Sequence, residues 1–488
     1  MKYILSLDQG TTSSRSLVIN ENGEVKGISQ KEFKQFFPRP SWVEHDAKEI
    51  WETQLNTIQT VIKENNIAFN DIAAISITNQ RETVVAFDSE TGAPICNAIV
   101  WQCRRTAEYC NSLKEKYSTQ IKEKTGLEID AYFSGPKMKW IIDNTPEAKE
   151  LIKNKRLRFA TIDSWLLWNL TGGKSFYTDP SNASRTMFFN IKENKYDQDL
   201  LTLFGIEEWM LPRVLNSNGD FGNSSKDILG AEIPICGILG DQQAALFGQC
   251  CFKKGELKVT YGTGGFLLIN TGSDPVLKEN LVTTIAWGID GNLTYAIEGS
   301  IFICGSVIQW LRDGLRIIEN AQESEKLAIS LSSNEGVYLV PALVGLGAPH
   351  WDQDARGIII GLTRGTGRSH IVRAAIESMA YQIADVVIPL KDYLPNDSHV
   401  KVDGGATKNN FLLQFQADIL NYPVMRSSQA EATALGVAYL AGLKCGIWKS
   451  LDDISKKWHP DELFIPRTNR SHEYVKWKDA VLRSMHWN

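Results

Sequence analysis

The chain contains no long hydrophobic run. None of its apolar segments, in 488 residues, approaches the length of roughly 20 residues that is needed to span a bilayer. Basic residues are not in excess either, because 52 Lys and Arg face 57 Asp and Glu, which gives a net charge of −5. This balance argues against non-specific binding to nucleic acid or to anionic membranes. Because the N-terminus also lacks the pattern of a secretory signal, we expect a cytoplasmic protein with no nucleic-acid partner and no stable membrane insertion.

Cysteine is scarce as well. The eight cysteines include no Cys-x-x-Cys pair and no zinc-ligand spacing, so neither a disulfide framework nor a structural zinc site is expected. The sequence also has no GxxxxGK[ST] loop and none of the protein-kinase motif set. These absences exclude the P-loop and protein-kinase types of nucleotide site.

What the chain does have, close to its start, is a turn rich in hydroxyl groups, DQGTTSSR at 8–15. Strand-like apolar runs at 3–7 and 16–20 flank this turn. Gly10 permits close approach of a ligand to the backbone, and the hydroxyls and N–H groups that follow suit phosphate oxygens. Asp8 is suited to a hydrated Mg²⁺ ion. An ordinary hairpin turn is the alternative, because Gly, Thr and Ser are common in turns.

The same pattern recurs in the middle of the chain. A strand–turn–strand unit at 257–270, with Gly-Thr-Gly-Gly in its bend, repeats the arrangement of 3–20 and indicates an internal duplication. We therefore predict two domains, 1–247 and 248–488, as the length also favours. Predicted strands alternate with helical segments such as 46–62, which indicates an α/β fold whose strand ends face a ligand cleft.

The motifs of the chain resemble those of the actin-like ATPase superfamily and, within it, the glycerol kinase branch of the FGGY carbohydrate kinase family. The resemblance covers residues 3–445 in order, and two longer family patterns fit at 132–144 and 357–377. The six short motifs that carry it are DQGTTSSR (8–15), ITNQRET (77–83), WQCRR (101–105), GDQQAALFGQ (240–249), TYGTGGF (260–266) and VDGGATKNNF (402–411). It implies an α/β fold of two duplicated actin-like (ribonuclease H-like) domains. Mixed sheets with flanking helices and an active site in the interdomain cleft belong to that expectation.

The function that the resemblance implies is ATP-dependent phosphorylation of glycerol to sn-glycerol 3-phosphate, in glycerol uptake and catabolism. Phosphorylating an alcohol needs a base, a metal-bound triphosphate and an in-line approach. The resemblance assigns Asp241 as the general base; for this residue alone, a capping or salt-bridged carboxylate is the alternative. Another polyol or pentulose kinase of the same family, or an actin-like nucleotide switch without a small substrate, remain alternative functions.

The resemblance also implies two sets of binding residues. For glycerol they are hydrogen-bonding groups and covering aromatic rings, namely Arg81, Glu82, Tyr132, Asp241, Gln242, Trp101 and Phe266. For ATP they are Thr11, Thr12, Ser13, Arg15 and Thr263 at the phosphates and Gly305, Gln309, Gly405 and Asn409 at the adenosine, with Asp8 on the Mg²⁺ side. Each group has a simpler alternative. Residues 81 and 82 could form an exposed ion pair worth under about 1 kcal/mol, and the aromatic residues could belong to the core. Gly405 could be a helix-entry turn, and Gln309 could lie on the surface.

Regulation and assembly complete the expectations. The stretch 217–233 contains no histidine, and it has no Gly/Lys-rich loop with an arginine. Relatives controlled by histidine phosphorylation or by fructose 1,6-bisphosphate carry those features, so we expect neither control in this chain. We also expect a homo-oligomer, either a dimer or a tetramer.

Overall fold

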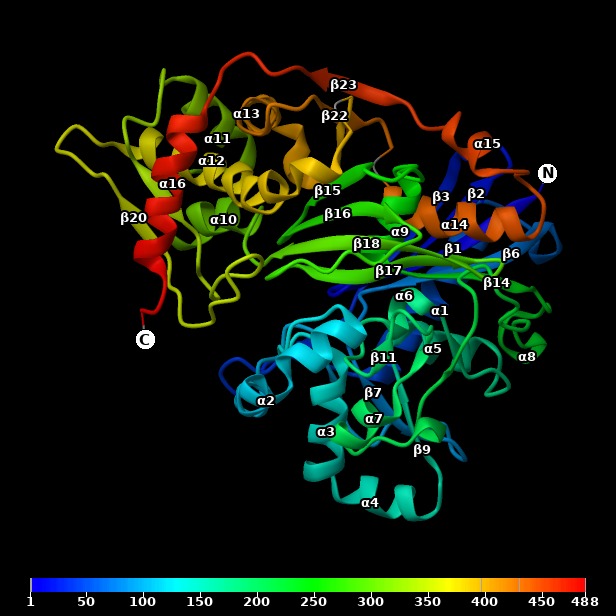
Figure 1. Cartoon of the computed structure of the whole chain (residues 1–488). Helices are drawn as coiled ribbons and strands as arrows, with labels where there is room; N and C mark the ends of the chain where they lie inside the picture. Colours follow the sequence, from blue (N-terminus) through cyan, green and yellow to red (C-terminus); the bar gives the residue numbers. More distant parts are fainter. Residues whose placement is uncertain (1, 396, 430, 488) are drawn as a thin grey trace.

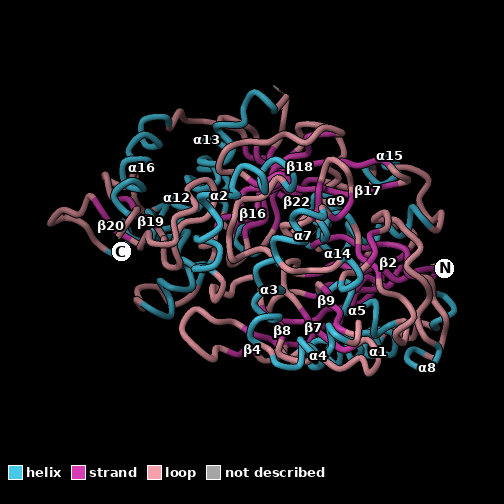
Figure 2. The backbone as a smooth tube through the Cα atoms, turned by 60° about the horizontal axis from the view of Figure 1, so that its bottom comes forward, coloured by secondary structure: helices cyan, strands magenta, loops and turns pink. Residues whose placement is uncertain are grey.

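Two large sheets flanked by helices form the computed structural model, which describes residues 2–395, 397–429 and 431–487 (Figures 1 and 2). The first sheet has the strand order β14-β6-β1-β2-β3, and the second has the order β17-β18-β16-β15-β21-β22-β23. Mixed sheets with helices beside them are the α/β architecture that the sequence predicts.

The first sheet is built from the N-terminal half of the chain. Its strands are β1 (Tyr3–Gln9), β2 (Ser13–Asn20), β3 (Val25–Glu32), β6 (Ile72–Asn79) and β14 (Ile235–Gly240). The predicted meander is confirmed, since β2 runs antiparallel to both β1 and β3. Strand β6 runs parallel to β1, and β14 runs parallel to β6. The carboxyl ends of β1, β6 and β14 therefore lie at one edge of the sheet.

The second sheet repeats this topology. Its strands are β15 (Leu257–Tyr261), β16 (Gly265–Gly272), β17 (Val282–Ile289), β18 (Asn292–Ile301), β21 (Val400–Asp403), β22 (Val424–Ser427) and β23 (Pro460–Phe464). Strand β16 is antiparallel to both β15 and β18, whereas β21 is parallel to β15 and β22 is parallel to β21. Strands β18, β16, β15, β21 and β22 thus match β3, β2, β1, β6 and β14 in order and direction. The predicted duplication is confirmed.

Helices cover both sheets. Helix α1 (Ala47–Glu64) begins as predicted, because the Asp46 carboxylate accepts the N–H groups of Lys48 and Glu49, and it buries Ile50, Ile58 and Val61 against the first sheet. The other α-helices beyond α9 and α14 are α2 (Ala107–Thr125), α3 (Ser134–Asn144), α4 (Pro146–Lys153), α5 (Ile162–Leu170), α6 (Pro180–Ala183), α7 (Gln198–Phe204), α8 (Lys226–Leu229), α10 (Ser306–Gln309), α11 (Ala321–Ile329), α12 (Arg368–Val387), α13 (Asn410–Leu420), α15 (Leu451–Ser455) and α16 (Ser471–Ser484). No helix in the described ranges combines the length and the apolar character that crossing a membrane requires.

Short strands outside the two large sheets form small local sheets of two or three strands. They are β4 (Gln35–Phe36), β5 (Glu44–His45), β7 (Val85–Asp88), β8 (Ala98–Ile99), β9 (Leu157–Ala160), β10 (Tyr177–Thr178), β11 (Phe189–Asn190), β12 (Lys195–Tyr196), β13 (Arg213–Val214), β19 (Tyr338–Val340) and β20 (Ile358–Ile360). Strand β8 pairs with β5 just before Trp101 and so fixes the start of the segment that carries this side chain.

Two helices join the halves of the molecule. Helix α14 (Ala432–Lys444) comes late in the chain but packs on β1, β6 and β14 of the first sheet, and Figure 1 shows it in orange beside those blue and green strands. It also contacts α9 (Asp241–Gly248) along its length. A Cβ atom on Gly436 would lie 1.8 Å from the carbonyl oxygen of Ala244, so the two helix backbones touch. Helix α9 thereby lies against α14 and contacts strands of both sheets.

Candidate active site

The candidate residues gather where parallel strands of the first sheet end. Asn79, the last residue of β6, pairs in register with Gln9 of β1 and with Gly240 of β14. Arg81 and Glu82 follow β6 closely, and Asp241 directly follows β14. Residues that follow adjacent parallel strands meet at one sheet edge, which is the usual place of a ligand cleft in α/β proteins.

Arg81 is the centre of this group. Its side chain is 1% exposed, which excludes the exposed ion pair that was the alternative. The guanidinium donates to Glu298 through Nη1 (2.6 Å) and Nη2 (3.1 Å), to Gln243 (3.2 Å) and to the Tyr132 hydroxyl (2.9 Å). Its Nε lies 3.2 Å from Asp241 Oδ1. The N–H fork is therefore used inside the protein, and Nε is the donor that faces the candidate base.

Close approach of the backbone makes room for this arginine. A Cβ atom on Gly240 would lie 2.7 Å from Arg81 Cδ, so a larger residue before Asp241 would displace the side chain. Arg81 itself has a φ of 57°, in the left-handed region that residues with a Cβ atom seldom adopt. A non-glycine residue in this conformation at a buried site is held there by its surroundings.

Two buried carboxylates and two buried guanidiniums alternate next to the base. Arg185 donates through Nε to Glu82 (2.6 Å) and through Nη2 to Glu298 (2.9 Å). Burial alone would raise the pKa of Glu298, but Arg185 and Arg81 outweigh it and lower the pKa to about 2. Burial raises the pKa of Glu82 despite its two arginine neighbours. Glu82 Oε2 is buried and has no hydrogen-bond partner in the described part of the chain, so its capacity to accept a hydrogen bond is unused.

Asp241 is the partly exposed member of the group. Its side chain is 29% exposed and its Oδ1 accepts the N–H of Gln242 at 2.7 Å. Burial of the surrounding site raises the pKa of Asp241, while Arg81 and Lys258 oppose this rise. A carboxylate whose pKa lies above its ordinary value accepts a proton from a hydroxyl more readily. The position therefore suits a general base.

Aromatic rings close the other side of the group. The rings of Trp101 and Tyr132 are 5.6 Å apart, and those of Trp101 and Phe266 are 6.3 Å apart. Trp101 Nε1 donates to the Thr11 hydroxyl at 2.9 Å and so connects the rings to the first turn. Trp101 and Phe266 are partly exposed, which is unlike plain core. Residues from both halves of the chain thus form one wall.

The first turn lies beside this wall. Thr12 is exposed and Thr11 is partly exposed, whereas Ser13 is buried and its hydroxyl accepts a hydrogen bond from Gln30 at 3.0 Å. Arg15 pairs with Glu431 at the start of α14 and with Asp8 at 3.5 Å. The positive charge of Arg15 is therefore already balanced by two carboxylates.

Asp8 meets the requirements for a magnesium-side residue. Burial raises the pKa of Asp8 to about 6; Arg15 opposes the rise, and the charges of Glu431 and Asp241 add to it. A divalent cation near these like charges would relieve their repulsion. The described residues contain no group of three or more His, Cys, Asp or Glu side chains that could hold a metal ion. Mg²⁺ usually keeps several waters and takes one or two carboxylates plus phosphate oxygens.

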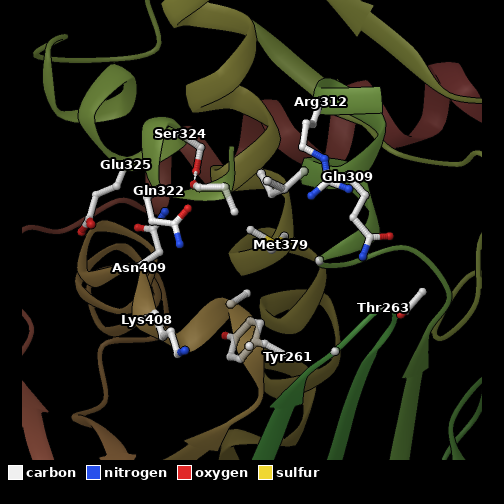
Figure 3. A pocket seen from close by; sticks show the side chains of 16 residues that line it. Tyr261, Thr263, Gln309, Arg312, Gln322, Ser324, Glu325, Met379, Lys408 and Asn409 are labelled. Carbon is white, nitrogen blue, oxygen red and sulfur yellow. Dashed lines mark hydrogen bonds between the residues drawn. The ribbon is translucent and has the colours of Figure 1, made fainter. Parts of the chain in front are cut away.

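A cavity of about 390 Å³ opens in the second half of the chain (Figure 3). Gln309 and Arg312 lie on one side, Gln322 and Asn409 lie on the other, and Met379 lies between them. The predicted residues Thr263, Gly305, Gln309, Gly405 and Asn409 all line it. Its size falls within the range of small-molecule sites, and its lining combines apolar and polar groups.

Hydrogen bonds attach the second turn to this cavity. The N–H groups of Cys304 and Gly305 donate to the carbonyl oxygens of Thr263 and Gly262, each at 2.9 Å. A Cβ atom on Gly305 would lie 2.6 Å from Gly262 O, so the contact needs glycine there. Helix α10 starts immediately after it and ends at Gln309, where a π-helical turn containing Arg312 follows.

Several residues of the site were not predicted. Around the base and the first turn they are Arg185, Gln243, Lys258, Glu298 and Glu431, and in the cavity they are Arg312, Gln322, Ser324, Glu325, Met379 and Lys408. A single charged residue inside an apolar strand is a signal that could have identified Glu298 and Lys258. Arg185 and Glu431 carry no such signal.

Comparison with known proteins gives consistent matches over almost the whole chain. Residues 3–248 match the N-terminal domain of the FGGY family of carbohydrate kinases, and residues 257–445 match its C-terminal domain. A protein of Thermotoga maritima named glycerol kinase 2 is 57% identical, with 100% of this chain and 99% of that protein covered. A glycerol kinase of Thermococcus kodakarensis is 53% identical, and the match covers 100% of this chain and 98% of that protein.

Solved structures agree in fold. The glycerol kinase of Plasmodium falciparum with ADP superposes with a TM-score of 0.92 at 37% identity, covering 99% of this chain and 98% of that chain. A ligand-bound xylulose kinase of Lactobacillus acidophilus has a TM-score of 0.88 at 22% identity, covering 99% and 97%. The second of these similarities concerns the fold alone.

Proposed function

This chain belongs to the FGGY family of carbohydrate kinases, and from that membership we propose that it transfers the γ-phosphoryl group of ATP to glycerol. The products are sn-glycerol 3-phosphate and ADP. The observation that carries the proposal is the partly exposed Asp241, which lies next to Arg81 Nε, while the same arginine donates to Tyr132 of the aromatic wall. The names of the relatives that are 52–57% identical support glycerol as the acceptor.

The acceptor half of the mechanism follows from the free hydrogen-bonding groups. Asp241 accepts the proton of the attacking hydroxyl as that oxygen bonds to the transferred phosphorus, a step worth on the order of 10²–10⁴ in rate. Glu82 Oε2 accepts from a second hydroxyl. Tyr132 already accepts from Arg81, so its own O–H is left to donate. Gln242 and Arg81 Nε add donors, while Trp101 and Phe266 cover the carbon chain and exclude water.

The nucleotide half uses both turns and the cavity. The groups that we assign to the phosphates are Thr11, Thr12, Ser13, Arg15 and Thr263, and those that we assign to the adenosine are Gly305, Gln309, Gly405 and Asn409. Asp8 would hold Mg²⁺ through water, and the ion when bound would neutralise charge on the phosphates. We propose that 1–247 and 248–488 act as two domains that close over the substrates. We further propose a cytoplasmic location and a dimer or tetramer.

The test is an ADP-release assay with glycerol, xylulose, ribulose or no acceptor. We expect the highest kcat/KM with glycerol and almost no ADP without an acceptor. Asp241→Asn should remove the glycerol-dependent rate, whereas Asp227→Asn, the same change on the exposed helix α8, should retain it. A higher kcat/KM for a pentulose would overturn the choice of substrate. ATP hydrolysis that no polyol alters would favour a nucleotide switch.

Arg81→Ala separates the two halves of the site. Because Arg81 Nε faces Asp241 and its Nη2 positions Tyr132, we expect the KM for glycerol to rise far more than the KM for ATP. Equal increases in both would mean that Arg81 does not belong to the acceptor half.

A further inference from the structure

Lys258 is a buried cation that the proposed mechanism does not use. It is the second residue of β15, and its neighbours Leu257 and Val259 belong to the hydrophobic core of the second half. Since successive strand residues point to opposite faces, Lys258 points away from that core, toward α9. Its side chain has no exposed surface.

The contacts of Lys258 differ from those of the two arginines nearby. Nζ donates to Gln242 Oε1 at 2.6 Å and to the Thr260 hydroxyl at 2.9 Å, and both acceptors are neutral. Arg81 is bound by Glu298 and Arg15 by Glu431, but no carboxylate in the described ranges lies within ion-pair distance of Lys258. The ammonium group of Lys258 is thus buried next to the side-chain amide of Gln242, which belongs to the acceptor half of the site.

This contact determines how Gln242 faces the cleft. An ammonium group has three donors and no acceptor, so the atom of Gln242 that faces it must be the carbonyl oxygen. The two ends of a Gln amide are otherwise hard to tell apart, and the hydrogen-bond network assigns them. With Oε1 bound to Lys258, the Nε2 group is the free end of the amide. Next to it, the Asp241 carboxylate can only accept.

We propose that Lys258 is a positioning residue of the acceptor site, which presents the Nε2 group of Gln242 as a donor to a hydroxyl of a polyol substrate. A polyol then donates one hydroxyl to Asp241 while another accepts from Gln242. This inference rests on the proposed function, because it needs a polyhydroxylated acceptor beside Asp241.

The charge of Lys258 adds a pH signature. Burial lowers the pKa of Lys258 to about 8, opposed by Asp403 on β21, Asp241 on α9 and Glu298 on β18, while Arg81 lowers it further. The charged form is lost as the pH rises through this value. A neutral amine has a lone pair, so Gln242 is then no longer restricted to one orientation. We expect the KM for glycerol to rise above about pH 8, and this rise to be absent in Lys258→Met.

The experiment compares Lys258→Met with Lys401→Met by steady-state kinetics. Lys401 is the register partner of Lys258 on β21, and it donates to the backbone carbonyls of Gln249 and Cys250. Losing one oriented hydrogen bond corresponds to about tenfold in affinity. We expect Lys258→Met to raise the KM for glycerol about tenfold and to leave the KM for ATP within about twofold. Lys401→Met should change neither.

Gln242→Leu shows whether Lys258 acts through the amide. If it does, Lys258→Met combined with Gln242→Leu should raise the KM for glycerol no more than Gln242→Leu alone. The inference would be overturned if the effects of the two single substitutions on the KM for glycerol multiplied in the double variant. It would also be overturned if Lys258→Met raised the KM for glycerol and the KM for ATP equally. Should Lys258→Met fail to fold, Gln242→Glu keeps a partner for Lys258 but replaces the donor, and an unchanged KM for glycerol would overturn it equally. Wild-type protein without any polyol-dependent ADP release would instead refute the proposed function.

Discussion

Replacing Lys258 by methionine should alter how the stability of the protein depends on pH. In the folded chain the pKa of Lys258 is about 8, whereas its ordinary value is 10.5, because the ammonium is buried. The folded state therefore binds this proton more weakly than the unfolded chain does. Methionine has a similar length but no titratable group, so the variant removes this one contribution.

The sign follows from the difference in bound protons. Between pH 8 and 10.5 the unfolded chain holds the proton of Lys258 and the folded chain does not, so the free energy of unfolding rises with pH in this window. Each pH unit contributes about 1.36 kcal/mol. Between pH 7 and 9.5 the wild type should thus gain about 2 kcal/mol that Lys258→Met does not gain. The variant also loses two hydrogen bonds, at about 1 kcal/mol each. This loss lowers its free energy of unfolding by the same amount at both pH values.

Differential scanning calorimetry at pH 7 and pH 9.5 measures this change. With about 2.1 cal/mol/K of unfolding entropy per residue, 1 kcal/mol corresponds to about 1 °C in a chain of 488 residues. The Tm of the wild type relative to that of Lys258→Met should therefore rise by about 2 °C between the two pH values. Taking the Tm difference between the wild type and the variant at each pH cancels the contributions of the other titrating groups. Lys401→Met serves as the control. A Tm difference that does not change with pH would refute the reasoning.

Three further changes test the cavity, the buried charges and the contact between α9 and α14. Gly405→Leu should raise the KM for ATP about tenfold or more, because the new side chain would occupy the cavity. The Tm should change little, since a Cβ atom at this position meets open space. Gly367→Leu, whose Cβ atom also meets open space, is the kinetic control. Glu298→Ala should destabilise the fold by about 3–5 kcal/mol in calorimetry, because it removes the buried carboxylate that Arg81 and Arg185 share. A Tm equal to that of the wild type would contradict this expectation. Gly436→Ala should reduce the free energy of unfolding by about 1–3 kcal/mol or more, because the added Cβ atom meets the backbone of α9, and it should therefore lower the Tm by about 1–3 °C. An unchanged Tm would mean that the two helices do not touch.

Local signals in the sequence predicted the elements well. The apolar run, turn and second run at 3–20 became β1, a bend and β2, and the unit at 257–270 became β15 and β16. Helix α1 begins where Asp46 and the apolar spacing place it. Such features depend on residues within a few positions of each other, so their physical causes are visible in the sequence.

The partners of the charged groups were not predictable in this way. Arg81 meets Glu298, 217 residues later, and Arg15 meets Glu431, 416 residues later. These contacts exist only when the two sheets and α14 have assembled, and no local pattern encodes them. The sequence did offer one usable sign, because Glu298 is the charged residue of an otherwise uncharged strand, where burial requires a partner.

The distribution of these partners changes the role of the first turn. Arg15 belongs to the motif at 8–15, but Glu431 and Asp8 balance its charge, so the turn adds little net positive charge for a triphosphate. Its hydroxyls, its backbone N–H groups and the link from Trp101 to Thr11 are what it can offer a ligand. Further positive charge lies in the nucleotide cavity, which Arg312 and Lys408 line. Through its ion pair with Glu431, Arg15 also ties β2 to α14, which makes the turn part of the joint between the two halves of the molecule.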